Sequence, residues 1–275
     1  MRAHTTVVYC AIDDFMPVSG KPLLGFPEFL EGLCSAGIPC VWVTSRSRHQ
    51  LDLALRRLGH AAPFIAEGGA AVFLPEDYFH LKEERTIRLG RFTCIPVASI
   101  QPAASETLDV LSEETGIAVV SLRSLSPREL VQNTGLNRDA AEALRQRDFD
   151  ELFFFVGATE DDIQRFQKVA AHRKFTVRAV DSLWSLCVGA SLATCVRHLG
   201  KLYDRALHAH AFSVFLATTQ QSGGLLPVCD RGIVLTNRHD DAPAKHDQHP
   251  TPKTLPMFAA DTWELALDSI RNRQF

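Results

Sequence analysis

The spacing of apolar and polar residues alternates between two periods in the first third of the chain. Residues 7–12 form a continuous apolar run, which is typical of a buried parallel strand. Helical spacing follows over 27–36, a strand over 39–44, an amphipathic helix over 50–58 and a short strand over 63–66. Strands that alternate with helices predict a doubly wound α/β sheet.

The pattern changes after about residue 82 and returns near residue 187. Within this block Ser126, Asn137 and Thr159 stand where helix N-caps are expected, and Asp162 completes a capping box with Thr159. We predict helices over 103–115, 127–134 and 139–146 and after Thr159, and strands over 118–121, 151–156 and 175–180. The later segments resume the doubly wound pattern, with helices over 192–209 and 262–271 and strands over 212–217 and 232–235.

The domain organisation follows from this change of pattern. We predict a Rossmann-like core domain made of residues 1–82 and 187–275, with an α+β cap domain inserted at residues 83–186.

Composition narrows the class of protein. With 46% hydrophobic residues the chain can bury a core, which excludes a disordered protein. A net charge of −3 and the lack of a long basic run argue against nucleic-acid binding. The sequence has no apolar span of membrane length and no signal-type segment, so we expect a cytoplasmic protein. Seven cysteines without a Cys-x-x-Cys pair indicate free thiols, with Cys10, Cys34, Cys40, Cys187, Cys195 and Cys229 in apolar, buried segments.

The end of the first strand is the first candidate for chemistry. Ligand sites of α/β proteins lie at the carboxyl edge of the sheet, and residues 11 and 13 share one face of the strand. A nucleophile and an acid/base partner would occupy these two positions. Asp13 supplies one carboxylate, whereas position 11 is Ala11. Cys10 has the opposite parity, so we expect its thiol to point away.

Other polar groups have competing interpretations. Ser45, Arg46 and Arg48 follow the second strand, where they form either an anion site or an ordinary exposed turn. His208 and His210 at a helix end are explained by the helix dipole. The His- and Asp-rich segment 237–254 is interpreted as a solvated loop rather than a metal site; its possible ligands are His239, Asp240, Asp241, His246, Asp247 and His249.

Several segments resemble a known family over nearly the whole chain. Residues 44–46 are similar to its Thr-Ser-Lys motif and residues 63–79 to its Glu-Asn-Gly-Gly segment. Residues 134–141 and 147–151 are similar to its cap signature, which is the most specific match. The sequence thus resembles the haloacid dehalogenase (HAD) superfamily of phosphohydrolases and, within it, the mannosyl-3-phosphoglycerate phosphatase-like family.

The resemblance implies a reaction and assigns its positions. Family members attack phosphorus with one aspartate, protonate the leaving group with a second, bind Mg²⁺ through carboxylates and balance charge with a lysine. The nucleophile position is Ala11, the acid/base position Asp13, the second-motif hydroxyl Thr44 and the lysine position Leu192; the metal positions are Ala11, Asp13, Thr218 and Ser222. The ligand-binding positions are Ser45, Arg46, Gly68, Gly69 and Arg147, of which Gly68 replaces the family's asparagine.

These replacements lead to three hypotheses about function. The first is a pseudophosphatase without metal or other cofactor, which binds a phosphorylated sugar or glycerate ligand or a protein partner. The second is an active phosphohydrolase with altered, metal-independent chemistry. The third is a scaffold subunit of an oligomer. In the cap, Arg145, Arg147, Asp150 and Glu151 either face a ligand cleft, as the resemblance implies, or form ion pairs.

Overall fold

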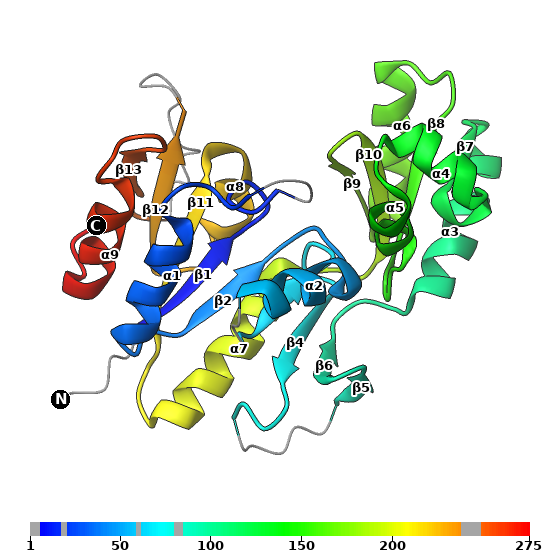
Figure 1. Ribbon diagram of the computed structural model, residues 1–275. Coiled ribbons are helices and arrows are strands. Elements are labelled where there is room, and N and C mark those ends of the chain that lie inside the picture. The colour runs from blue at the N-terminus through cyan, green and yellow to red at the C-terminus, as the bar shows by residue number, and fades with distance from the viewer. Residues whose placement is uncertain (1–5, 18–20, 59–61, 80–84, 238–248) are drawn as a thin grey trace.

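The computed structural model describes residues 6–17, 21–58, 62–79, 85–237 and 249–275, without the side chains of residues 53, 54, 56–58 and 220–222. Its strands form two separate sheets, of nine and four strands. In Figure 1 the larger sheet lies to the left and the smaller one, in green, to the right. In the described part of the chain, no helix combines the length and the apolar character needed to cross a bilayer.

The larger sheet is the core sheet and has the order β13-β12-β11-β1-β2-β3-β4-β6-β5. Pairing is parallel from β13 to β3 and antiparallel from β3 to β5. Its parallel strands are β1 (Thr6–Ala11), β2 (Cys40–Val43), β3 (Phe64–Ala66), β11 (Phe212–Thr218), β12 (Arg231–Thr236) and β13 (Lys253–Pro256). The antiparallel edge is β4 (Ala71–Pro75), β6 (Phe92–Pro96) and β5 (Ile87–Leu89).

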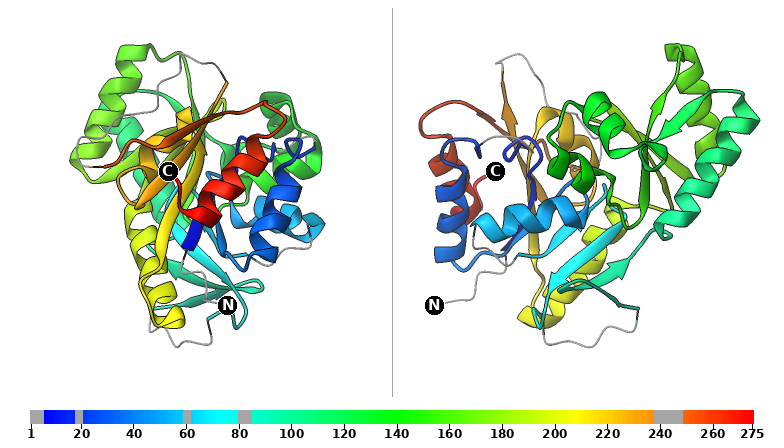
Figure 2. Two further views of the ribbon diagram at one scale, coloured as in Figure 1. Left: turned by 90° about the vertical axis from the view of Figure 1, so that its left-hand side faces the viewer. Right: turned by 45° about the vertical axis from the view of Figure 1, so that its right-hand side comes forward.

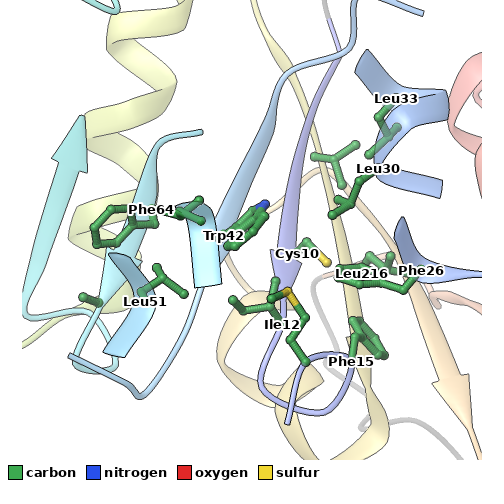
Figure 3. Packing of buried hydrophobic residues seen from close by; sticks show 14 of the residues in the cluster. Cys10, Ile12, Phe15, Phe26, Leu30, Leu33, Trp42, Leu51, Phe64 and Leu216 are labelled. Atoms are coloured by element: carbon green, nitrogen blue, oxygen red, sulfur yellow. The ribbon is translucent and has the colours of Figure 1, made fainter. Parts of the chain in front are cut away.

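Helices cover both faces of this sheet. Val8, Cys10 and Ile12 pack in one cluster with α1, α2 and α9, as Figure 3 shows for Cys10 and Ile12. Tyr9 and Ala11 pack on the opposite face with α7 and α8. Strand alternation therefore separates Cys10 from Ala11, which confirms the parity prediction. The helices are α1 (Phe26–Ser35), α2 (Arg48–Leu58), α7 (Leu192–Leu207), α8 (Thr219–Leu225) and α9 (Thr262–Asn272).

The smaller sheet belongs to the cap and is antiparallel in the order β7-β8-β10-β9. Adjacent residues of β8 enter different cores: Phe153 packs with α3 and α6, and Leu152 packs with α4 and α5. The two faces are visible in the right-hand view of Figure 2. The elements are α3 (Gln101–Thr115), β7 (Val119–Ser121), the 3-10 helix η1 (Leu122–Ser124), α4 (Pro127–Thr134), α5 (Arg138–Arg145), β8 (Asp150–Phe155), α6 (Glu160–His172), β9 (Phe175–Val180) and β10 (Leu183–Val188).

The α/β class with an inserted α+β unit is confirmed, but the predicted limits of the insertion, 83–186, need correction. Strand β6 pairs with β4 and strand β5 pairs with β6, so both belong to the core sheet, and β10 continues to Val188 in the cap sheet. The short, partly exposed β5 has no apolar run that would have marked it as a core strand. The two connections lie side by side, because the Ser99 amide donates a hydrogen bond of 2.9 Å to the Val188 carbonyl.

All seven cysteines are free thiols. Cys10, Cys187, Cys195 and Cys229 are buried as predicted, and Cys40 is half-buried. Cys34, on α1, is exposed, which differs from the prediction. Of the predicted loop 237–254, residues 238–248 lie outside the described part of the chain. Its last two residues, Lys253 and Thr254, are the first two residues of β13.

Candidate functional site at the carboxyl edge of the core sheet

The loops that follow β1 and β2 meet at the carboxyl edge of the core sheet. The Ile12 amide donates to the Val43 carbonyl at 3.1 Å, which extends the pairing of the two strands to their ends. Asp13 and Thr44 come directly after this point, and the Thr44 hydroxyl donates to the Asp13 carboxylate. Ser45 donates to the same carboxylate twice, from its amide and from its hydroxyl, both at 2.7 Å.

Arg46 completes the surroundings of Asp13. Its Nε lies 3.5 Å from Asp13 Oδ1, and its Nη2 donates to the Asp13 carbonyl at 3.2 Å. The two side chains are 11% and 18% exposed, so the ion pair is only partly screened by water. Asp13 thus has its counter-ion and three hydrogen-bond donors within its own domain. We refer to Asp13, Thr44, Ser45 and Arg46 as the strand-edge cluster.

The positions assigned to the nucleophile and the lysine hold apolar residues, and these residues have apolar surroundings. Ala11 is buried in the cluster beneath α7 and α8, and Leu192 packs against that cluster from the first position of α7. The helix starts here because the Ser191 hydroxyl accepts the Thr194 amide as an N-cap.

The assigned metal positions do not provide a fitting ligand set for Mg²⁺. An octahedral Mg²⁺ site uses carboxylate and water oxygens. The Asp13 oxygens are occupied as described, and the Thr218 hydroxyl donates to the Asp14 carboxylate. The side chain of Ser222 lies outside the described residues. Within the described chain, no three His, Cys, Asp or Glu side chains are arranged to hold a metal.

Gly68 and Gly69 lie in close contact with the cap and with α7. Gly68 has φ +59°, its amide donates to the Thr44 carbonyl at 3.0 Å, and its carbonyl accepts Arg178 Nη1 of the cap at 2.9 Å. A Cβ at Gly68 would overlap the Arg178 guanidinium, and one at Gly69 would overlap the Leu192 backbone. Sequence analysis missed Arg178, since an arginine within a strand carries no local signal of a contact made in another domain.

Glu67 is a second residue that sequence analysis did not single out. Its fully buried carboxylate accepts three backbone amides at the start of β8, from Asp148 at 3.0 Å, Phe149 at 2.9 Å and Asp150 at 2.8 Å. The amide bonds favour the ionised form, but burial and the nearby Asp150 outweigh them and raise the pKa of Glu67 to about 8. Glu67 therefore ties the core to the cap backbone.

Arg147 makes the second connection between the domains. Its guanidinium binds Asp150 at 2.5 and 2.8 Å and also donates to the Ser45 carbonyl at 2.7 Å and to Gln50 at 3.1 Å. Burial opposes ionisation of Asp150, yet Arg147 and Arg178 hold the pKa of this carboxyl below its usual value. Of the two interpretations of Arg147, the structure contains the ion pair.

Arg48 makes the third connection. It binds Asp148 through Nε and Nη2, both at 3.0 Å, and both side chains are 13% exposed. This paired geometry is the strong form of a guanidinium–carboxylate contact. We refer to Arg48, Glu67, Arg147, Asp148, Asp150 and Arg178 as the core–cap junction.

Comparisons with curated proteins give sequence relatives of one kind. The chain is 29% identical over 150 residues to a glucosyl-3-phosphoglycerate/mannosyl-3-phosphoglycerate phosphatase from Persephonella marina, covering 54% of this chain and 53% of that protein. It is 27% identical over 116 residues to a protein of the same name from Methanococcoides burtonii, covering 42% and 43%. The matches thus span about half the length of these relatives. No family model matches the chain.

Comparisons with solved structures cover nearly the whole chain. A haloacid dehalogenase-like hydrolase from B. subtilis matches with a TM-score of 0.63 and 14% sequence identity, and the match covers 98% of this chain and 100% of that chain. A HAD subclass IIB sugar phosphatase has a TM-score of 0.58 and 13% identity, covering 96% and 98%. The chain has the haloacid dehalogenase fold, and its sequence is similar to mannosyl-3-phosphoglycerate phosphatases.

Proposed function

We propose that this HAD-fold chain is a noncatalytic relative of the phosphatases that it resembles, and that it binds a phosphorylated sugar or glycerate ligand without hydrolysing it. The observation that carries the proposal is the strand-edge cluster. Asp13, at the acid/base position, is neutralised by Arg46 and hydrogen-bonded by Thr44 and Ser45. Two residues before it, Ala11 offers no group that can attack phosphorus.

The chemistry of the neighbouring positions supports the same proposal. A covalent phosphatase needs a nucleophile, an acid and a cation that stabilises developing negative charge. At the lysine position Leu192 contributes apolar contact, and at one metal position Thr218 bonds to Asp14. Loss of a covalent nucleophile lowers turnover by roughly 10⁴- to 10⁶-fold in other enzymes.

A phosphatase assay tests the proposal directly. Mannosyl- and glucosyl-3-phosphoglycerate are incubated with Mg²⁺ at high protein concentration, and released phosphate is measured beside calorimetric titration of the same compounds. We expect binding without turnover. Turnover that Asp13→Asn abolishes and the exposed cap variant Asp161→Asn preserves would contradict the noncatalytic function, since it would assign the activity to this site.

A second candidate function is a hydrolase with metal-independent chemistry. One observation favours it: Asp14 is exposed at the strand edge and accepts the Thr218 hydroxyl, so it can act as a base toward a water molecule. This candidate predicts phosphate release that persists in a chelator and is lost in Asp14→Asn. Release unaffected by Asp14→Asn argues against it.

A further inference from the structure

A polar cavity lies between the core and the cap, apart from the strand-edge cluster. Its volume is about 450 Å³, which is in the range of small-metabolite sites. His49 comes from α2 of the core, and the other lining residues come from the cap: Arg123, Glu142, Arg145, Gln146 and Arg147. All six side chains are polar or charged, so the lining offers hydrogen-bond donors and acceptors to a charged, hydrophilic ligand.

Two arginines of the lining differ in how they are held. Arg145 donates to the Leu125 carbonyl at 3.1 Å and to Glu142 at 2.6 Å, which fixes its guanidinium while leaving the side chain 27% exposed. Arg123 is 49% exposed, and its Nε lies 3.5 Å from Glu151, too far for a strong hydrogen bond. A guanidinium has five N–H donors, so both arginines retain donors for a ligand.

His49 contributes an imidazole to this wall. Arg48 Nη2 approaches His49 Nε2 at 2.9 Å, and because a guanidinium only donates, the imidazole proton lies on Nδ1. Burial and the adjacent Arg48 lower the pKa of His49, which favours the neutral ring. Arg147 contributes to the wall, but four of its five N–H donors are already engaged by Asp150, Gln50 and Ser45.

We propose that this cavity binds the phosphate group of a small hydroxylated metabolite, with Arg123 and Arg145 as the phosphate ligands. Paired guanidinium groups match phosphate oxygens in charge and in planar geometry. Glu142 serves two purposes: it holds Arg145, and its carboxylate accepts a hydrogen bond from a ligand hydroxyl. The inference goes beyond the proposed function, because Asp13, Thr44, Ser45 and Arg46 do not line this cavity.

Calorimetric titration of the full chain with inorganic phosphate and with 3-phosphoglycerate tests the site, with glycerol as the uncharged control. We expect both anions to bind, 3-phosphoglycerate more tightly, and glycerol not to bind. Arg123→Gln and Arg145→Gln each weaken binding by at least about tenfold, since each removes a charge-assisted hydrogen bond. The matched control is Arg165→Gln, because Arg165 is also an exposed cap arginine beside a carboxylate, Asp162.

Three results would overturn the proposal. The first is wild-type protein that binds neither anion. The second is unchanged affinity in Arg123→Gln, or an equal loss in Arg165→Gln, which would mean that net charge alone attracts the anion. The third is loss of binding in Arg46→Gln but not in Arg123→Gln, which would assign the anion to the strand edge. If Arg145→Gln does not fold, the half-exposed Arg123 decides the test by itself.

Discussion

At the strand edge, Ala11 and Leu192 are apolar, and the carboxylate of Asp13 is bound by groups of its own domain. At the core–cap junction, by contrast, charged groups bind across the domain boundary, as Glu67 does with the amides of β8 and Arg48 with Asp148. The two regions share the same loops, and Ser45 belongs to both through its hydroxyl and its carbonyl. The comparison shows that the contacts that hold the cap on the core are separate from the positions at which the family's reaction would take place.

The largest effect is expected at Arg147. Arg147→Met leaves Asp150 buried without its main counter-ion, which costs about 3–5 kcal/mol of unfolding free energy. The control is Arg173→Met, which removes the exposed pair with Glu114 and costs at most about 1 kcal/mol. Urea unfolding measures both. Equal costs would mean that the junction contributes no more than a surface ion pair.

Glu67 sharpens the comparison through pH. Because its pKa is raised from 4.5 to about 8 on folding, the folded state binds the extra proton, and the unfolding free energy falls as pH rises between these values. Glu67→Gln removes this titration and places an amide donor against backbone donors, which costs about 2–3 kcal/mol at low pH. We expect a flatter pH profile in urea unfolding between about pH 5 and 8. If the unfolding free energies of the wild-type protein and Glu67→Gln changed with pH in parallel, the raised pKa of Glu67 would be contradicted.

Gly68 tests how tightly the cap closes over the strand edge. Gly68→Asn introduces a Cβ that overlaps Arg178, at an expected cost of about 1–3 kcal/mol. Gly116→Asn is the matched control, since Gly116 has φ +66° and open space around the added atom. In an Arg178→Ala background the cost of Gly68→Asn should shrink to that of the control. A cost that persists there would place the strain elsewhere in the loop.

The smallest effect is expected inside the strand-edge cluster. Ser45→Ala removes one of the hydrogen bonds to Asp13 but leaves the Ser45 amide in place, so we expect a loss of about 1 kcal/mol. Ser124→Ala, which loses an exposed bond to the Ser121 carbonyl, is the reference. A loss at Ser45 as large as that at Arg147 would remove the distinction between the two regions.

Local signals in the sequence were enough for much of the fold. Ser126, Asn137 and Thr159 cap their helices as predicted, because a cap depends on hydrogen bonds within four residues. The central parallel strands β1, β11 and β12 carry continuous apolar runs because both of their faces are buried. The strands β5 and β13 were missed because they are short and lie at the two edges of the core sheet, where one side needs no apolar cover; β6, which lies between β4 and β5, was missed as well.

The residues of the site also fall into those that local sequence signals identify and those whose contacts are distant in the chain. Asp13 and the loop of Thr44, Ser45 and Arg46 were each placed after a strand, and the structure brings them together because neighbouring parallel strands end at one edge. Glu67 and Arg178 were not singled out, because their partners are backbone groups about 81 and 110 residues away. A backbone partner leaves no residue type in the sequence from which the contact can be inferred.

The hydrogen bond between Ser99 and Val188 has a consequence for modularity. The chain leaves the core and re-enters it at nearly the same point, so the cap occupies the topological place of a single surface loop. Closing such a short gap takes little conformational entropy compared with joining distant ends. The connection is therefore a natural splice point, at which one cap can be exchanged for another without changing the register of the sheet below.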